Sequence, residues 1–296
     1  TAQLIAAYGI EAKLTLYNVL PSSIDNIPGG VIECIPNARS RDEIGKALPC
    51  SLKTYFLQQF GSPNSPRYQY AQRAFILSCA GYAVTSYILQ VRDRHNGNIM
   101  ISNINGELIH IDFGFIFDIS PAGNLNFERV AFKLTSEMLD LMMEDTSIVQ
   151  QVADKNPASI AAAATSSSAA TKHVYSSPLY IWFVQNIIRV FLAVRRHCLE
   201  YLAATVPMLT STLPCFLGNK EHWYSDSLIR FYERLFPHDN EANAAARMYQ
   251  LVLQANNHWR TNTYDWIQLK QQRIFYWADK TNDNHLQQMQ LDDIRQ

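Results

Sequence analysis

Polar side chains are concentrated in the run Asp93-Arg94-His95-Asn96-Gly97-Asn98, which lies between two apolar stretches of the chain. Such a dense group of polar residues must face a cleft or find partners, because buried polar groups without hydrogen bonds are costly. The carboxylate of Asp112 and the amide oxygen of Asn98 are hard ligands of the kind that Mg²⁺ takes together with water and substrate phosphates. With Asp93 to orient or deprotonate a nucleophile, these residues predict group transfer from a nucleotide.

The elements around this run can be predicted from periodicity. Two short strands are expected over 98–102 and 107–112, joined by an Asn-Gly turn, which is the strongest two-residue hairpin signal. The hairpin returns the chain and is expected to bring Asp112 close to Asn98. The preceding residues, 67–91, predict a helix that is apolar on nearly all sides and therefore lies in the middle of a lobe.

The rest of the chain predicts short strands first and helices later, an α+β fold. Strands are expected over 14–20 and 30–35, the second of them buried, and helices over 51–60, 178–205, 226–236, 240–256 and 263–279. The residues Ser40-Arg41-Asp42-Glu43 have the form of a capping box that opens a short helix. Residues 145–177 are rich in Ala and Ser and are interpreted as a flexible insertion without chemistry.

Composition excludes several classes of protein. Apolar residues make up 48% of the 296 residues, which is enough for a core. The formal net charge of −1 argues against a nucleic-acid binder, because neutralising phosphates requires clustered positive charge. The five cysteines lie far apart, so neither a zinc site nor a disulfide framework is expected. No stretch is long and apolar enough for a membrane span.

Two motifs match known phosphoryl-transfer sites. Asp93 and Asn98 have the spacing of the catalytic Asp and metal-binding Asn in the protein-kinase pattern HRDxxxxN, and Asp112-Phe113-Gly114 matches the DFG metal site. The inverted order Asp-Arg-His points away from ordinary protein kinases. The run DRHNGNIM, followed by IHIDFGF, resembles the lipid kinases of the phosphoinositide 3-/4-kinase superfamily.

Within that superfamily the type III phosphatidylinositol 4-kinases fit best. The blocks that resemble their beta form are Ala71–Arg73, Ser78–Tyr82, Asn124–Leu125, Ala131–Thr135 and Leu213–Phe216. Residues Gly30–Pro36 are closer to the alpha form. The resemblance extends from about Gly29 to Lys270, except across the insertion, and leads us to expect a beta-like enzyme.

The resemblance implies a bilobal protein-kinase-like fold that uses ATP and Mg²⁺, with Mn²⁺ as a substitute. It implies transfer of the γ-phosphate to the 4-hydroxyl of phosphatidylinositol. Residues 1–36 would be a remnant of the N-terminal lobe with its hinge strand, and 37–296 the C-terminal lobe. By the same resemblance, Asp93 would orient or deprotonate the inositol hydroxyl, and His95 would lie beside the transferred phosphoryl group as a second acid/base candidate or as a charge stabiliser. Arg94 would brace the loop, and Asn98 and Asp112 would hold Mg²⁺. The residues implied to contact the nucleotide are Glu33 and Ile35, which would offer backbone groups to adenine, and Met100 and Ile111, which would lie beneath the base.

The stretch after DFG should contact the lipid headgroup, with Arg129 and Lys133 as its candidate cations. It has no cationic cluster of the kind that polyphosphorylated inositides require, which favours unphosphorylated phosphatidylinositol. The expected C-terminal helix over 263–279 carries aromatic and basic residues that suit a membrane interface, or that pack in part on the helical lobe. The resemblance implies peripheral attachment to Golgi or other intracellular membranes, with small GTPases as recruiters.

One departure from the family concerns the N-terminal lobe. We find neither a Gly-rich phosphate loop nor a lysine at the position of the family's ATP lysine. The missing elements would precede Thr1, so the chain is expected to be either a fragment or a product that has lost half of its nucleotide site. Without those elements the 296-residue chain itself should be weak or inactive. Three alternatives stay open: a phosphatidylinositol 3-kinase, a Ser/Thr protein kinase of the same superfamily, and a catalytically incomplete docking module.

Overall fold

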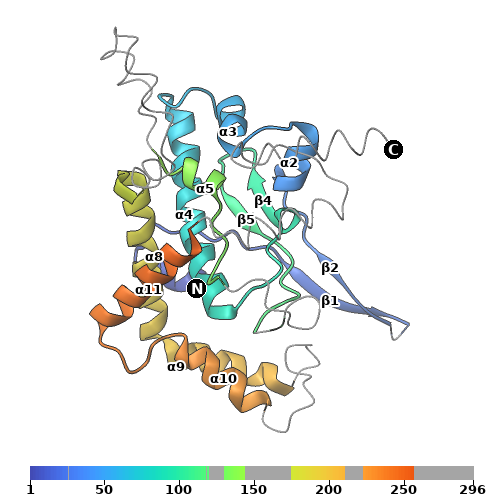
Figure 1. Ribbon diagram of the computed structural model, residues 1–296. Helices are drawn as coiled ribbons and strands as arrows, with labels where there is room; N and C mark the ends of the chain where they lie inside the picture. Colours follow the sequence, from blue (N-terminus) through green and yellow to red (C-terminus); the bar gives the residue numbers. More distant parts are fainter. Residues whose placement is uncertain (26, 118, 120–129, 144–174, 211–222, 257–296) are drawn as a thin grey trace, which may run out of the picture.

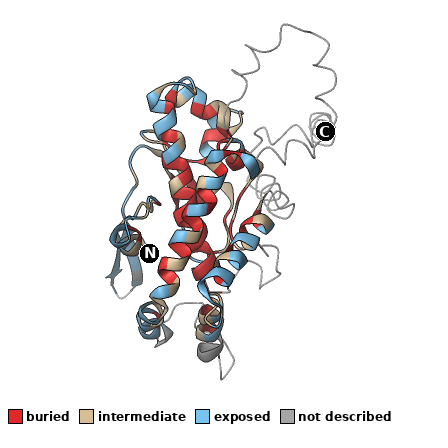
Figure 2. Cartoon of the chain, turned by 90° about the vertical axis from the view of Figure 1, so that its left-hand side faces the viewer, coloured by how far each residue is buried: buried red, intermediate tan, exposed pale blue. Residues whose placement is uncertain are grey.

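The central element of the fold is the helix α4 (Pro66–Leu89) (Figure 1). The computed structural model describes residues 1–25, 27–117, 119, 130–143, 175–210 and 223–256. The Ser65 side chain caps the start of α4 by accepting the N–H of Tyr68, and the helix ends where Gln90 adopts a left-handed φ of 51°. Its residues are buried on nearly all sides, as predicted, because other elements surround it (Figure 2).

Helices cover α4 along much of its length. The long helix α8 (Pro178–Arg196) packs on α4, and α11 (Glu241–Ala255) packs on α8. The aromatic side chains of Phe183 and Phe191 on α8 are completely buried. After α8 the chain continues through α9 (Cys198–Thr205), η2 (Val206–Thr210) and α10 (Trp223–Glu233), and the N-terminal helix α1 (Ala2–Ala7) also packs on α8. The single helix predicted over 178–205 is therefore wrong, since the backbone leaves helical geometry at His197 between α8 and α9.

A three-stranded antiparallel sheet lies on the other side of α4, with the order β3 (Ala38–Ser40), β4 (Ile99–Ser102) and β5 (Leu108–His110). The predicted β4–β5 hairpin is confirmed, with Ile99 opposite His110. Its turn needs glycine at position 106, where φ is +74° and an added Cβ would lie 2.9 Å from the Ala71 carbonyl oxygen.

A second, separate hairpin projects from the body of the molecule and consists of β1 (Val19–Ile24) and β2 (Ile27–Ile32) (Figures 1 and 2). The predicted buried strand over 30–35 is wrong, because Val31 and Ile32 are 62% and 64% exposed. Successive residues on a strand point to opposite faces, so both faces of this hairpin are open within the described part of the chain. The strand predicted over 14–20 starts only at Val19.

Short helices complete the fold: α1 (Ala2–Ala7), α2 (Arg41–Ala47), α3 (Leu52–Phe60), η1 (Asn96–Asn98) and α5 (Ser136–Asp140). The capping box of α2 is confirmed, because the Ser40 side chain accepts the N–H of Glu43 and the Glu43 carboxylate accepts the N–H of Ser40. The helix expected over 263–279 and nearly all of the insertion lie outside the described residues. The described helices include none that could cross a membrane. A mixed helix and sheet fold is confirmed, whereas a bilobal arrangement stays a prediction.

Candidate active site

The loop that follows α4 lies beside the segment that follows β5. The backbone N–H of Arg92 donates to the Phe115 carbonyl at 2.8 Å, and that of Phe117 donates to the Leu89 carbonyl at 2.8 Å. Further along, the N–H of Ile111 donates to the Asn98 carbonyl at 3.1 Å. These main-chain bonds bring the two polar motifs of the sequence together.

The Arg94 side chain lies inside this junction and is 3% exposed. Its guanidinium donates to the carbonyls of Arg92 at 3.0 Å and Ile111 at 2.7 Å, and also to the carbonyl of Asp112. Its charge also lies 5.6 Å from the ring centre of Phe113. A planar group with several fixed donors suits this task, so the structure gives Arg94 the contacts expected of a loop brace.

The side chains of Asp93 and His95 face each other, and each is 15% exposed. The distance from His95 Nε2 to the Asp93 carboxylate oxygen is 4.0 Å. The other ring nitrogen, Nδ1, accepts the backbone N–H of Gly97 at 3.0 Å. A neutral imidazole whose Nδ1 accepts carries its proton on Nε2, so His95 presents a donor on the side where Asp93 lies.

The two candidate metal ligands lie on the two segments that the junction joins. The Asn98 side chain is buried, and its amide group donates to the Asp93 carbonyl at 3.0 Å, which leaves its oxygen as an acceptor. Asp112 is exposed, and one of its carboxylate oxygens accepts the N–H of Gly114 at 3.1 Å. One amide oxygen and one carboxylate fit a magnesium ion that completes its shell with water and phosphate oxygens. In the described part of the chain, no three His, Cys, Asp or Glu side chains gather as a metal site.

Both aspartates have an unusual backbone. Asp93 has a φ of +60° and Asp112 a φ of +57°, in the left-handed region that non-glycine residues seldom adopt. Strained backbone persists only where the surroundings impose it, and it clusters at functional sites. At Asp112 the Arg94 guanidinium donates to the carbonyls of Ile111 and of Asp112 itself, and so holds the peptide groups on both sides of this residue.

The four residues predicted to contact the nucleotide are divided between two sheets. Glu33 and Ile35 follow β2, and the exposed Glu33 carboxylate accepts the backbone and side-chain N–H groups of Asn18, each at 2.8 Å. Met100 lies on β4, and Ile111 follows β5. The structure thus places Met100 and Ile111 next to the candidate catalytic loop, and Glu33 and Ile35 at the base of the projecting hairpin.

Of the two residues predicted to contact the lipid headgroup, the structure describes one. Arg129 lies outside the described residues. Lys133 is half-buried, and its ammonium group donates to the Asn96 side-chain oxygen at 2.8 Å. This bond fastens the segment before α5 to the candidate catalytic loop, and it is an observed role for Lys133 in addition to the predicted contact with substrate.

Sequence reasoning missed a buried carboxylate behind His95. Asp42, the second residue of α2, is 6% exposed, and burial raises its pKa, while nearby His95 and Lys133 oppose that shift. A Cβ added at Gly97 would lie 2.9 Å from His95 Nδ1 and 3.2 Å from an Asp42 oxygen, so both groups pack on Gly97. The only signal in the sequence was a second acidic residue inside the capping box.

A second missed residue is His110 at the end of β5. Its ring stacks on Tyr82 of α4 with centres 4.5 Å apart and planes 17° from parallel. Burial, together with the charges of Arg94 and Lys133, lowers the pKa of His110 well below its usual value. The ring is therefore neutral at physiological pH and acts as a packing element two residues before Asp112.

Comparison with known proteins decides the family. The family model described as phosphatidylinositol 3- and 4-kinase matches residues 21–217. This range is two thirds of the chain and contains both polar motifs. The chain belongs to the phosphatidylinositol 3- and 4-kinase family. Membership of this kinase family implies the use of ATP and a divalent metal ion.

Individual relatives carry 4-kinase names. Phosphatidylinositol 4-kinase alpha 1 of Arabidopsis thaliana is 35% identical over 90% of the chain, and phosphatidylinositol 4-kinase STT4 of Saccharomyces cerevisiae is 35% identical over 89%. Phosphatidylinositol 4-kinase beta of Xenopus tropicalis is 50% identical but over 43% of the chain. The expected beta-like subtype is therefore not confirmed. The chain spans 11%, 12% and 15% of these three proteins, respectively.

Proposed function

We propose that this chain is the catalytic part of a phosphatidylinositol 4-kinase, which transfers the γ-phosphate of ATP to the 4-hydroxyl of phosphatidylinositol. The observation that carries the proposal is the junction of the two motifs, where Arg94 and the bond between Ile111 and Asn98 gather Asp93, Asn98 and Asp112. The names of relatives over nine tenths of the chain support 4-kinase rather than 3-kinase chemistry.

The geometry assigns separate tasks to Asp93 and His95. Since His95 Nδ1 already accepts a hydrogen bond, the neutral ring is a donor at Nε2 and cannot remove a proton there. His95 then suits the stabilisation of charge on the transferred phosphoryl group. Asp93 is left as the group that accepts or orients the proton of the inositol hydroxyl.

Asn98 and Asp112 would hold Mg²⁺ through one amide oxygen and one carboxylate. The ion, when bound, would neutralise charge on the β- and γ-phosphates. The Arg94 guanidinium stays outside this chemistry, because its donors are directed to main-chain carbonyls of the junction. Its task is to keep Asp112 in the left-handed conformation that the site requires.

The membrane and its partners belong to the same proposal. Phosphatidylinositol lies in a bilayer, so the protein must attach at least transiently to its surface, and the aromatic and basic residues of 263–279 suit that attachment. Location at Golgi or other intracellular membranes, and recruitment by small GTPases, extend the proposal by analogy with the family.

The decisive experiment is headgroup analysis of the product formed by the full-length protein on phosphatidylinositol vesicles with radiolabelled ATP. We expect phosphatidylinositol 4-phosphate, and an Asp93→Asn variant should lose about 10²–10⁴-fold in rate. The matched control is Asp25→Asn, since Asp25 lies at the exposed tip of the β1–β2 hairpin and also has a left-handed φ, of 52°. A 3-phosphate product, a phosphorylated protein, or nucleotide binding without turnover would each replace the proposal with one of the alternatives.

A further inference from the structure

A segment without regular secondary structure, Lys13–Tyr17, runs across α4 and leads into β1. We call it the N-terminal strap. The N–H of Lys13 donates to the Leu77 carbonyl of α4 at 3.1 Å. A Cβ at Gly81 would lie 2.3 Å from the Lys13 carbonyl oxygen, so the strap can cross at this height only because α4 has no side chain there.

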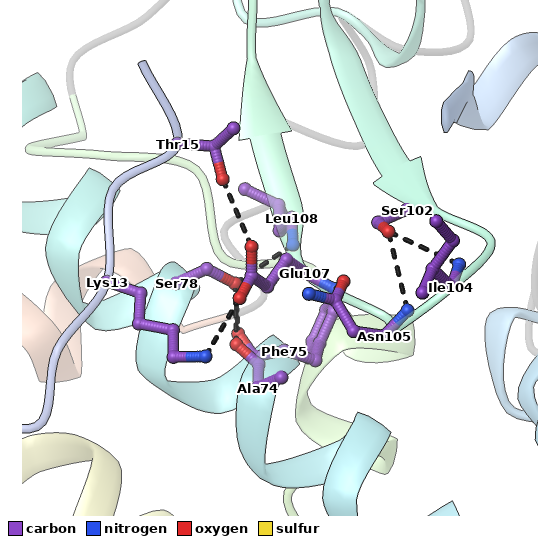
Figure 3. A network of polar contacts seen from close by, with 10 residues as sticks. All are labelled: Lys13, Thr15, Ala74, Phe75, Ser78, Ser102, Ile104, Asn105, Glu107 and Leu108. Carbon is purple, nitrogen blue, oxygen red and sulfur yellow. Dashed lines mark hydrogen bonds and ion pairs between the residues drawn. The ribbon is translucent and has the colours of Figure 1, made fainter. Parts of the chain in front are cut away.

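Glu107, the residue before β5, holds the strap with both carboxylate oxygens (Figure 3). The ammonium group of Lys13 donates to one oxygen at 2.9 Å, and the hydroxyl of Thr15 donates to the other at 3.1 Å. The Glu107 side chain is 15% exposed, which limits competition from water for these bonds. The adjacent N–H of Leu108 donates to the Ser78 hydroxyl of α4 at 2.9 Å, so strap, hairpin and central helix meet here.

The strap then follows β5 towards the candidate metal site. The Thr15 carbonyl accepts the hydroxyl of Tyr82 at 2.8 Å, and the Tyr82 ring is stacked on His110. Burial raises the pKa of the Tyr17 phenol, and the nearby backbone of Asp112 opposes this shift. The strap is therefore in contact with Glu107, the residue before β5, and with Tyr82 of the stack at the end of β5.

We infer that Glu107 is a positioning residue: by fastening the strap along β5 it fixes the location of Asp112 and couples the β1–β2 hairpin to the metal-binding end of the site. The strap enters β1 directly after Asn18, and β2 leads to Glu33 and Ile35. A displacement of the hairpin is thus transmitted towards Asp112 through Thr15, the Tyr82 ring and His110, which lies two residues before Asp112. The kinetic part of this inference rests on the proposed function.

The test is a charge exchange in the full-length protein, with the variants Lys13→Glu, Glu107→Lys and the double variant. Each single change places like charges opposite each other, so we expect the amides of residues 108–114 to exchange hydrogen about tenfold faster. The Mg²⁺ concentration for half-maximal activity should rise about threefold to tenfold, with the KM for phosphatidylinositol unchanged. The double variant should restore both quantities.

A matched control is the ion pair of Arg196 and Glu241, which has the same 2.9 Å separation but is exposed and joins α8 to α11. The variant Arg196→Glu should leave exchange in 108–114 unchanged. A second variant, Gly81→Ala, displaces the strap without touching Glu107, and should accelerate the same exchange while α4 stays folded.

The outcomes separate the two proposals. Unchanged exchange in both charge variants and in Gly81→Ala, or failure of the double variant to restore it, overturns the positioning role. If the full-length protein transfers no phosphate, the kinetic readout is lost and the proposed function fails, while the exchange measurement still decides the role of Glu107. Loss of activity with a proportional loss of thermal stability, and no specific change in 108–114, also overturns it.

Discussion

At the scale of single residues, the site depends on how closely groups pack around the catalytic loop. Gly97 is the clearest case, because the His95 ring and the Asp42 carboxylate both lie against it. Its backbone is not in the left-handed region, so what it contributes is the absence of a side chain rather than conformational freedom.

We predict that Gly97→Ala lowers the rate of phosphoryl transfer strongly. The added methyl group would lie 2.8 Å from the His95 ring and force it away from Asp93. A misplaced catalytic group costs about 100-fold, and the loss should appear in kcat rather than in the KM for ATP. Gly29→Ala in the projecting hairpin is the control, since no atom except a backbone oxygen at 4.0 Å lies near a Cβ there. Equal activity of the two variants would contradict the packing argument.

We also predict that Asp42→Asn stabilises the fold at neutral pH. Burial raises the folded pKa of Asp42, so the folded state binds a proton more readily than the unfolded state. The contribution of Asp42 to the free energy of unfolding is therefore greatest below about pH 4. It falls as pH rises through the folded pKa, by at most about 1.4 kcal/mol per pH unit.

The measurement is urea unfolding of both proteins between pH 4 and pH 7. The advantage of the Asn variant should grow as pH rises, whereas Asp25→Asn at an exposed position should show no such trend. An advantage that is constant with pH, or that grows towards acid, would show that the carboxylate is not penalised by burial.

At the scale of elements, one carboxylate joins three helices. Glu137 in α5 accepts two hydrogen bonds from the buried Arg41 of α2, at 2.9 and 3.1 Å, and the N–H of Leu52 at the start of α3 at 3.3 Å. The Arg41 side chain is 4% exposed, so its charge depends on this arrangement.

We predict that Glu137→Ala lowers the free energy of unfolding by about 3–5 kcal/mol, because it leaves a buried guanidinium without its carboxylate. Chemical denaturation measures the effect. Glu241→Ala removes the carboxylate of an ion pair whose two side chains are about half exposed, and it should change stability far less. Similar losses of unfolding free energy in both variants would contradict the argument that the buried charge of Arg41 depends on the Glu137 carboxylate.

At the scale of the whole molecule, two features matter: the exposed β1–β2 hairpin, and the small share of its relatives' length that the chain covers. Val19, Leu20, Val31 and Ile32 are each more than half exposed, which is unusual for paired apolar strand residues. The chain spans 11% of the Arabidopsis relative and 12% of the yeast relative, so those two proteins contain much more polypeptide than this chain.

We predict that the 296-residue chain phosphorylates phosphatidylinositol at least about 100-fold more slowly than phosphatidylinositol 4-kinase alpha 1 of Arabidopsis thaliana, of which it spans 11%. The sequence offers no Gly-rich phosphate loop and no lysine at the ATP position, and each contributes charge stabilisation. Phosphate incorporation per mole of purified protein, at equal lipid concentration, measures this. Robust turnover by the chain alone would show that its own residues suffice.

The sequence determined the local elements and the identity of the site residues. Residues 67–91 were apolar on nearly all sides, Ser40 and Glu43 formed a capping box, and the Asn-Gly turn indicated the β4–β5 hairpin. Each of these signals depends on residues that are close together in the sequence. The spacing of Asp93, Asn98 and Asp112 was informative for the same reason.

Only the tertiary structure decided which strands are buried and which residues that are distant in sequence come into contact. An apolar strand is exposed or buried according to its neighbours, so the exposure of Val31 and Ile32 could not be predicted from their types. The contacts of Glu107 with Lys13 and Thr15, and of Asp42 with the catalytic loop, join residues far apart in the chain. No periodicity encodes such pairs, because they form only when separate elements pack together.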